Sequence, residues 1–134
     1  TGIIFVASLS DYDQKMFEDE TTNRMKDSVY LFRDICANPA FAETPIILFL
    51  NKRDLFQKKI RDVRIGGEGC FRDYDGPPND YAAGVDYFLR YFLKQNRDPD
   101  RKVFHHVTCA TDTANVQVVM DSTRAMIIQD SLNF

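Results

Sequence analysis

Short apolar runs alternate with longer amphipathic segments along this 134-residue chain. Residues 3–9 and 46–50 are continuous apolar runs of strand length, and residues 102–108 form a third, less apolar run. Between them, residues 22–37 and 80–95 carry apolar side chains at steps of three and four, which is typical of one helix face. The alternation predicts an α/β fold, in which helices cover both faces of a mostly parallel sheet of about three strands.

The remaining segments complete this predicted three-layer domain, which we expect to span residues 1–134. Residues 115–132 repeat the helical spacing and predict a last helix. Residues 60–78 are rich in turn formers and predict an irregular insertion. We interpret the polar stretch 10–13 as a turn, and we expect the strand at 102–108 to lie at a sheet edge.

Composition places the chain among globular proteins, with 44% hydrophobic and 28% charged residues. The formal net charge of −3 gives no reason to expect nucleic acid as a partner. Three scattered cysteines fit neither a disulfide framework nor a zinc site, and they favour a reducing, cytoplasmic compartment. No apolar run reaches the roughly 18 residues that a membrane span needs.

Polar turns follow the second and third predicted strands, where ligands of open α/β sheets bind. The first turn is the Asn-Lys-Arg-Asp sequence of residues 51–54, and the second is the Thr-Cys-Ala-Thr sequence of residues 108–111. Polar turns after strands are common, so the first motif alone is weak support for a nucleotide site. The pair, with both turns at one end of a parallel sheet, is far more specific.

These residue types suit the edge of a guanine base. The carboxylate of Asp54 can accept hydrogen bonds from the N1–H and 2-amino groups, a donor pair that adenine lacks. The stem of Lys52 can lie along the base while its ammonium stays in water. Asn51 can tie the two turns together, and the small Ala110 lets a backbone N–H approach the guanine O6.

The two turns resemble the guanine-specificity loops of regulatory GTPases, and the second resembles the version found in heterotrimeric G-protein alpha subunits. The gap between the loops is about twice that of small Ras-like GTPases, and the insertion at 60–78 accounts for it. Further stretches are similar to the same family, and together they run almost from end to end: IIFVASLSDYDQ, NRMKDSVYLFRDIC, TPIILFLNKRDLFQKKI and CATDTANVQVVMD.

The resemblance implies a partial Ras-like P-loop GTPase domain. The chain would supply the fourth, fifth and sixth strands and the third, fourth and fifth helices of the family's domain, without its first three strands. The guanine end of GTP or GDP would contact Asn51, Lys52 and Asp54, together with a second set from the other loop: Cys109, Ala110 and Thr111. The chain begins at Thr1 without Met, which is expected of a fragment.

The hydrolytic machinery of the family has no counterpart in this sequence. A phosphate-binding loop needs Lys followed by Ser or Thr, and no such pair occurs in the 134 residues. The family's Mg²⁺ ligands and water-positioning Gln are also absent from the sequence. We therefore expect no catalytic residue and no metal ligand here, weak guanine binding, and no GTP hydrolysis by this chain alone.

The resemblance also implies partners. In the family these are the βγ subunits, a G-protein-coupled receptor and an effector, at the cytosolic face of the plasma membrane. The lipid-bearing N-terminal helix of the family does not occur in these residues, and the final residues depart from the family's receptor-binding tail. The family's helix matching 22–37 lies on its effector surface, so Arg24 and Lys26 are candidate contacts. The apolar strand at 3–9 would present an open edge, which predicts self-association.

Two alternatives stay open at this point: a divergent small GTPase of the Ras type, and a non-enzymatic interaction module or inert fragment.

Adjacent strand residues point to opposite faces, so the two histidines of the third strand are not expected to chelate one metal ion. We interpret Asp11 and Asp13 as residues that solvate or cap a loop, and Lys58 and Lys59 as part of a solvated face. A structural or surface role is expected for His105 and His106.

Overall fold

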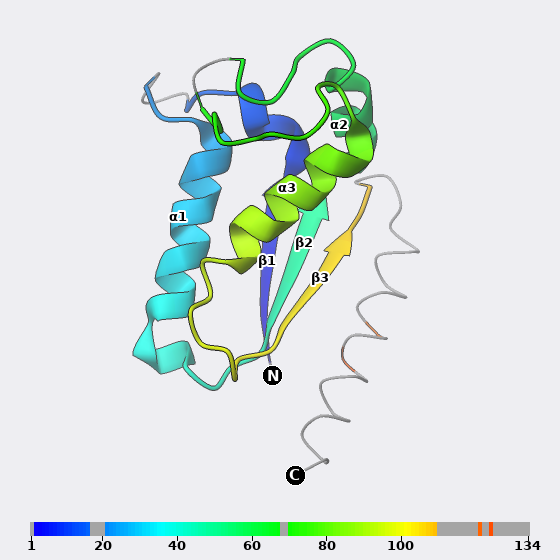
Figure 1. The fold of residues 1–134 in the computed structure, drawn as a ribbon. Helices are drawn as coiled ribbons and strands as arrows, with labels where there is room; N and C mark the ends of the chain where they lie inside the picture. Colours follow the sequence, from blue (N-terminus) through cyan, green and yellow to red (C-terminus); the bar gives the residue numbers. More distant parts are fainter. Residues whose placement is uncertain (1, 17–20, 68–69, 110–120, 122–123, 125–134) are drawn as a thin grey trace.

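The computed structural model describes residues 2–16, 21–67, 70–109, 121 and 124 (Figure 1). Its centre is a three-stranded sheet in the order β1 (Ile3–Ser8), β2 (Ile46–Asn51) and β3 (Val103–Val107). Both pairings are parallel, with Phe5 beside Leu48 and Leu48 beside His105. The predicted parallel sheet is therefore confirmed, and β3 lies at one edge of it.

Two helices follow the predicted positions with slightly shorter bounds. They are α1 (Arg24–Ala37) and α3 (Tyr81–Leu93). Each begins after a residue whose side chain caps it: Asn23 accepts from the Lys26 amide at 3.1 Å, and Asp80 accepts from the Ala83 amide at 2.9 Å. These caps satisfy amides that the first turn leaves without a helical partner.

Three shorter helical segments were not predicted. A seven-residue helix, α2 (Arg53–Lys59), stands where we expected a turn and a basic stretch. The supposed turn after β1 is a 3-10 helix, η1 (Leu9–Asp13), and a second one, η2 (Pro39–Phe41), follows α1. Segments this short do not show a helical period, although an acidic first turn and a basic last turn in α2 suit the helix dipole.

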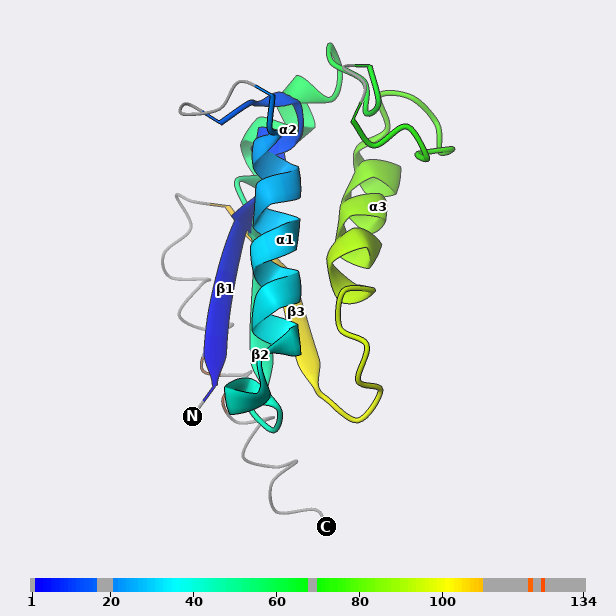
Figure 2. The same ribbon diagram turned by 90° about the vertical axis from the view of Figure 1, so that its left-hand side faces the viewer.

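The core lies between the sheet and the two longer helices, which cover the same face (Figure 2). The ring of Phe5 in β1 lies 5.3 Å from Phe32 of α1 and 6.2 Å from Phe92 of α3. The described residues thus form two layers. The helix predicted at 115–132, which would supply a third layer, lies outside the described residues.

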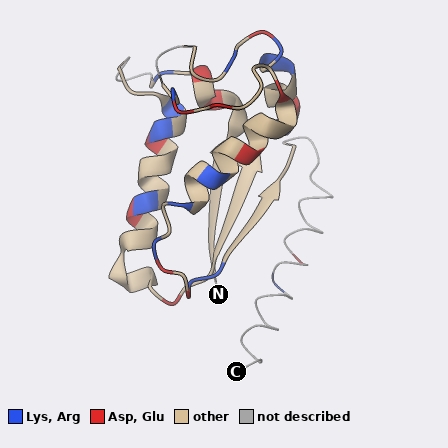
Figure 3. Cartoon of the chain, in the orientation of Figure 1, with Lys and Arg blue, Asp and Glu red and all other residues tan. Residues whose placement is uncertain are grey.

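The strands differ in how fully they are buried. The residues of β2 are buried on both faces from Ile46 to Leu50. In β1, by contrast, Ile4 and Val6 are 47% and 58% exposed. In the described sheet β1 is therefore an edge strand with exposed apolar side chains, whereas β2 is the buried central strand. The three strands contain no Lys, Arg, Asp or Glu, and in the described part of the chain these residues lie on helices and loops (Figure 3).

The segment predicted as an irregular insertion forms turns and bends at 60–67 and 70–78, with no helix or strand in these residues. Its Phe71 ring packs edge-on against Phe88 and Tyr91 of α3, at 5.1 and 5.4 Å. The Tyr87 hydroxyl donates to Asp73 at 2.5 Å. Burial and this carboxylate raise the pKa of Tyr87. The insertion is thus attached to α3 by aromatic contacts.

Gly84 provides a test of the packing between α3 and α2. A Cβ at this buried position would lie 2.9 Å from Phe56 Cζ and 2.9 Å from Ile60 Cδ1. Ala is preferred over Gly in helices by about 1 kcal/mol, but overpacking a core costs about 1–3 kcal/mol. We expect Gly84→Ala to lower the free energy of unfolding in urea denaturation.

The matched control is Ala82→Gly on the exposed side of the same helix. It should cost only the helix preference of about 1 kcal/mol. A Gly84→Ala variant that is more stable than the parent would contradict this close approach.

Candidate functional site

The carboxyl ends of β2 and β3 meet at one edge of the sheet, and the two predicted specificity turns meet with them. The Thr108 amide donates to the Leu50 carbonyl at 2.8 Å, and the Arg53 amide donates to the Thr108 carbonyl at 3.1 Å. The Thr108 hydroxyl donates to Asn51 Oδ1 at 3.3 Å. Backbone and side-chain contacts therefore join the two turns, and Asn51 has the linking position that we predicted.

The backbone turns sharply between β2 and α2. Lys52 has a left-handed conformation, with φ of 59°, and occupies the cap position before α2. Such a conformation is uncommon for a residue with a side chain, and it recurs at functional sites. The turn puts Asp54 in the first turn of the helix, where the helix dipole favours a negative charge.

The carboxyl group of Asp54 is charged, and one of its oxygen atoms accepts no hydrogen bond from a described residue. Burial raises the pKa of its carboxyl, but hydrogen bonds from the Cys109 thiol and the Leu55 amide outweigh this effect and hold the pKa below its ordinary value. The Oδ1 atom is buried and has no hydrogen-bond partner among the described residues. A buried acceptor of this kind is costly unless a donor is supplied. The site is therefore suited to a ligand with N–H groups.

The second turn is described only in part. Thr108 is buried and Cys109 is half-buried. The contact between the Cys109 thiol and Asp54 was not predicted, and it places the two turns in direct side-chain contact. Ala110 and Thr111, the other predicted ligands, lie outside the described residues.

The sequence comparisons agree with this geometry. Residues 1–127 match the family model described as "G-protein alpha subunit". The chain belongs to the G-protein alpha subunit family. The match therefore favours the alpha subunit over the divergent small GTPase that the sequence left open.

Individual alpha subunits are similar over nearly the whole chain. The "Guanine nucleotide-binding protein G(o) subunit alpha" of Caenorhabditis elegans is 45% identical over 132 residues, which is 98% of this chain. The "Guanine nucleotide-binding protein alpha-17 subunit" of the same organism is 47% identical, and the G(o) subunit of Locusta migratoria is 44% identical, each over 98% of this chain. The chain spans 36% of the length of each of these relatives.

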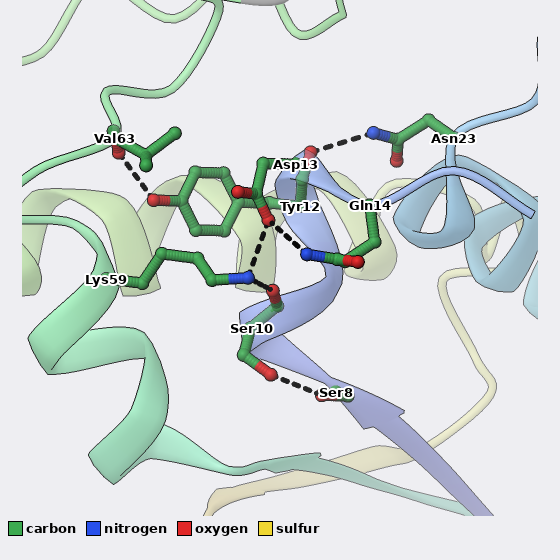
Figure 4. A network of polar contacts seen from close by, with 8 residues as sticks. All are labelled: Ser8, Ser10, Tyr12, Asp13, Gln14, Asn23, Lys59 and Val63. Atoms are coloured by element: carbon green, nitrogen blue, oxygen red, sulfur yellow. Dashed lines mark hydrogen bonds and ion pairs between the residues drawn. The ribbon is translucent and has the colours of Figure 1, made fainter.

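A polar cluster beside the alpha-subunit site corrects two of our interpretations (Figure 4). Lys59 Nζ lies 2.7 Å from Asp13 Oδ1, and the two side chains are only 24% and 14% exposed. Asp13 is therefore not a loop-solvating residue, and Lys59 is not part of a solvated face. The two residues lie 46 positions apart, so no local sequence signal could pair them.

Other chemistry is limited in the described part of this alpha-subunit chain. No group of three or more His, Cys, Asp or Glu residues there could hold a metal ion. His105 pairs in register with Leu48, and His106 with Phe49, so they lie on opposite faces as predicted. Burial and the neighbouring His105 lower the pKa of His106.

No helix in the described ranges is long and apolar enough to span a membrane.

Proposed function

We propose that this chain forms the guanine-recognising part of the nucleotide-binding domain of a G-protein alpha subunit, a signalling protein switched by GTP and GDP. One observation carries the proposal. Two turns from neighbouring parallel strands meet at Asp54, whose charged carboxylate has a buried oxygen without a partner among the described residues. The N1–H and 2-amino groups of guanine are the donors that such an acceptor needs.

The other proposed ligands follow from their positions. The left-handed Lys52 supports a stem that lies along the base, and Asn51, fixed by Thr108, would face the N7 side. Cys109, Ala110 and Thr111 complete the proposed second loop. In this assignment the described strands correspond to the family's fourth, fifth and sixth strands, and α1 and α3 to its third and fourth helices.

The wider functions belong to the whole alpha subunit. Mg²⁺, when bound with GTP, would neutralise phosphate charge, and it has no proposed ligand in this chain. We propose βγ subunits, a receptor and an effector as partners at the cytosolic membrane face. In α1, Arg24 is exposed, while Lys26 Nζ lies 5.4 Å from the Phe71 ring centroid. Arg24 is therefore the better supported effector contact of the two.

The base selectivity of the chain tests the proposal. We expect GMP to bind with a Kd in the millimolar range, about −4 kcal/mol, and AMP to bind about tenfold more weakly because it leaves the Asp54 acceptor unpaired. Equilibrium NMR titration measures both constants. Asp54→Ala should remove the preference, whereas Asp62→Ala, which changes an exposed carboxylate eight positions further along the chain, should keep it. Equal binding of GMP and AMP would refute guanine recognition.

The lack of a phosphate-binding motif in these residues generates a second expectation. The chain alone should not hydrolyse GTP, because nothing in its sequence holds Mg²⁺ or positions the attacking water. Single-turnover measurements should give the rate of buffer alone. A faster rate, or submicromolar binding of GDP in calorimetry, would show that the phosphate site is present after all.

We also propose self-association through β1. Its outer edge pairs with no other strand among the described residues, and Ile4 and Val6 expose apolar surface beside it. Open apolar edges template pairing with another chain. Sedimentation of the isolated chain should show dimers or larger species, and Val6→Lys should reduce them because a charged side chain blocks edge pairing. A monodisperse parent monomer would contradict this expectation.

A further inference from the structure

The helix that carries Asp54 is held at its far end by a partly buried ion pair (Figure 4). Lys59 is the last residue of α2, and its Nζ lies 2.7 Å from Asp13 Oδ1. The same ammonium donates to the Ser10 carbonyl at 2.8 Å. Both partners come from η1, the 3-10 helix that follows β1 directly. The C-terminal end of α2 is therefore attached to the end of the sheet.

The element that receives Lys59 is itself held from several sides. Ser8, immediately before η1, pairs in register with Asn51. Asn23, the cap of α1, donates to the Tyr12 carbonyl at 2.8 Å. The Tyr12 hydroxyl donates to the Val63 carbonyl at 2.5 Å, just beyond α2. Because β1, α1 and the chain after α2 all hold η1, the acceptors of Lys59 are in fixed positions.

A helix of seven residues needs such anchors. Helices this short are unstable without tertiary contacts, so packing decides where α2 lies. Its main apolar anchor is Phe56, which is fully buried against Tyr12 at 5.3 Å and Phe88 at 6.0 Å. Leu55, beside it, is 46% exposed. The first turn is also held, because the Arg53 amide donates to the Thr108 carbonyl at 3.1 Å, and Ile60 is buried directly after the last turn. The Lys59 ion pair is the polar contact that fixes the last turn of the helix against η1.

We infer that Lys59 and Asp13 are positioning residues for guanine recognition. Neither touches the base. Their ion pair fixes the direction of α2, and with it the Asp54 carboxylate at the other end, so that the acid meets both donors of guanine. This inference rests on the proposed function. Losing the pair should weaken the contact to the 2-amino group more than the rest of the binding, because that contact depends most on the angle of the carboxylate.

IMP separates this role from a purely structural one. It has the N1–H group and the phosphate of GMP but lacks the 2-amino group. If the ion pair only stabilised the fold, its loss would reduce the folded fraction and weaken the binding of GMP and of IMP by the same factor. If the pair positions Asp54, its loss weakens GMP binding more than IMP binding. The Kd ratio of IMP to GMP is therefore the decisive quantity.

The experiment is an NMR titration of the chain and its Lys59→Met variant with GMP and IMP. We expect the Kd ratio of IMP to GMP to be at least threefold lower, and closer to one, in Lys59→Met than in the parent chain. Lys59→Arg, which keeps the charge, should retain more of the ratio than Lys59→Met. The matched control is Arg90→Gln, which breaks an exposed ion pair with Asp86 at 3.0 Å on α3 and should leave the ratio unchanged.

Each outcome decides the matter. An unchanged ratio in folded Lys59→Met would overturn the positioning role and leave the guanine site in place. If Lys59→Met does not fold, Asp13→Asn, which keeps an acceptor for Lys59, is measured instead under the same criterion. A parent chain that binds GMP no better than AMP would overturn the proposed guanine site, and this inference with it.

Discussion

The parallel pairing of β2 with both of its neighbours is the constraint on which the other features depend. Parallel strands end at the same side of a sheet, so the residues that follow β1, β2 and β3 come together in space although they are far apart in sequence. The contacts of Thr108 with Leu50 and Asn51 are the direct consequence. The register pairs Leu50 with Val107, and this alignment places the residues that follow them, Asn51 and Thr108, within hydrogen-bond distance.

The short helix α2 places the residue that we propose to recognise guanine at this edge of the sheet. Its first turn carries Asp54, its middle is buried through Phe56, and its last residue is tied to η1 by Lys59. The left-handed conformation of Lys52 makes the change of direction between strand and helix. The position of the Asp54 carboxylate therefore depends on core packing, on the ion pair and on the strained turn. The guanine specificity that we propose follows from this position.

Periodicity explains which features could be predicted. The apolar runs of β1 and β2 and the spacing in α1 and α3 span enough residues to show a period. The seven residues of α2 do not, and neither does η1. The sequence predicts Asn51, Lys52 and Asp54 as guanine ligands because their donors and acceptors match the base, and this role stays a prediction. The contact from Cys109 to Asp54 and the Asp13–Lys59 pair could not be predicted, because each depends on tertiary proximity across many positions.

The most direct measurement exchanges the hydrogen-bonding pattern at Asp54. In Asp54→Asn the amide still accepts from the base N1–H, but it donates where the acid accepted, so it suits the 2-oxo group of xanthine instead of the 2-amino group of guanine. The account predicts opposite preferences in NMR titrations: the parent chain binds GMP more tightly than XMP, and the variant binds XMP more tightly than GMP. The same preference in both proteins would contradict the claim that Asp54 reads the base.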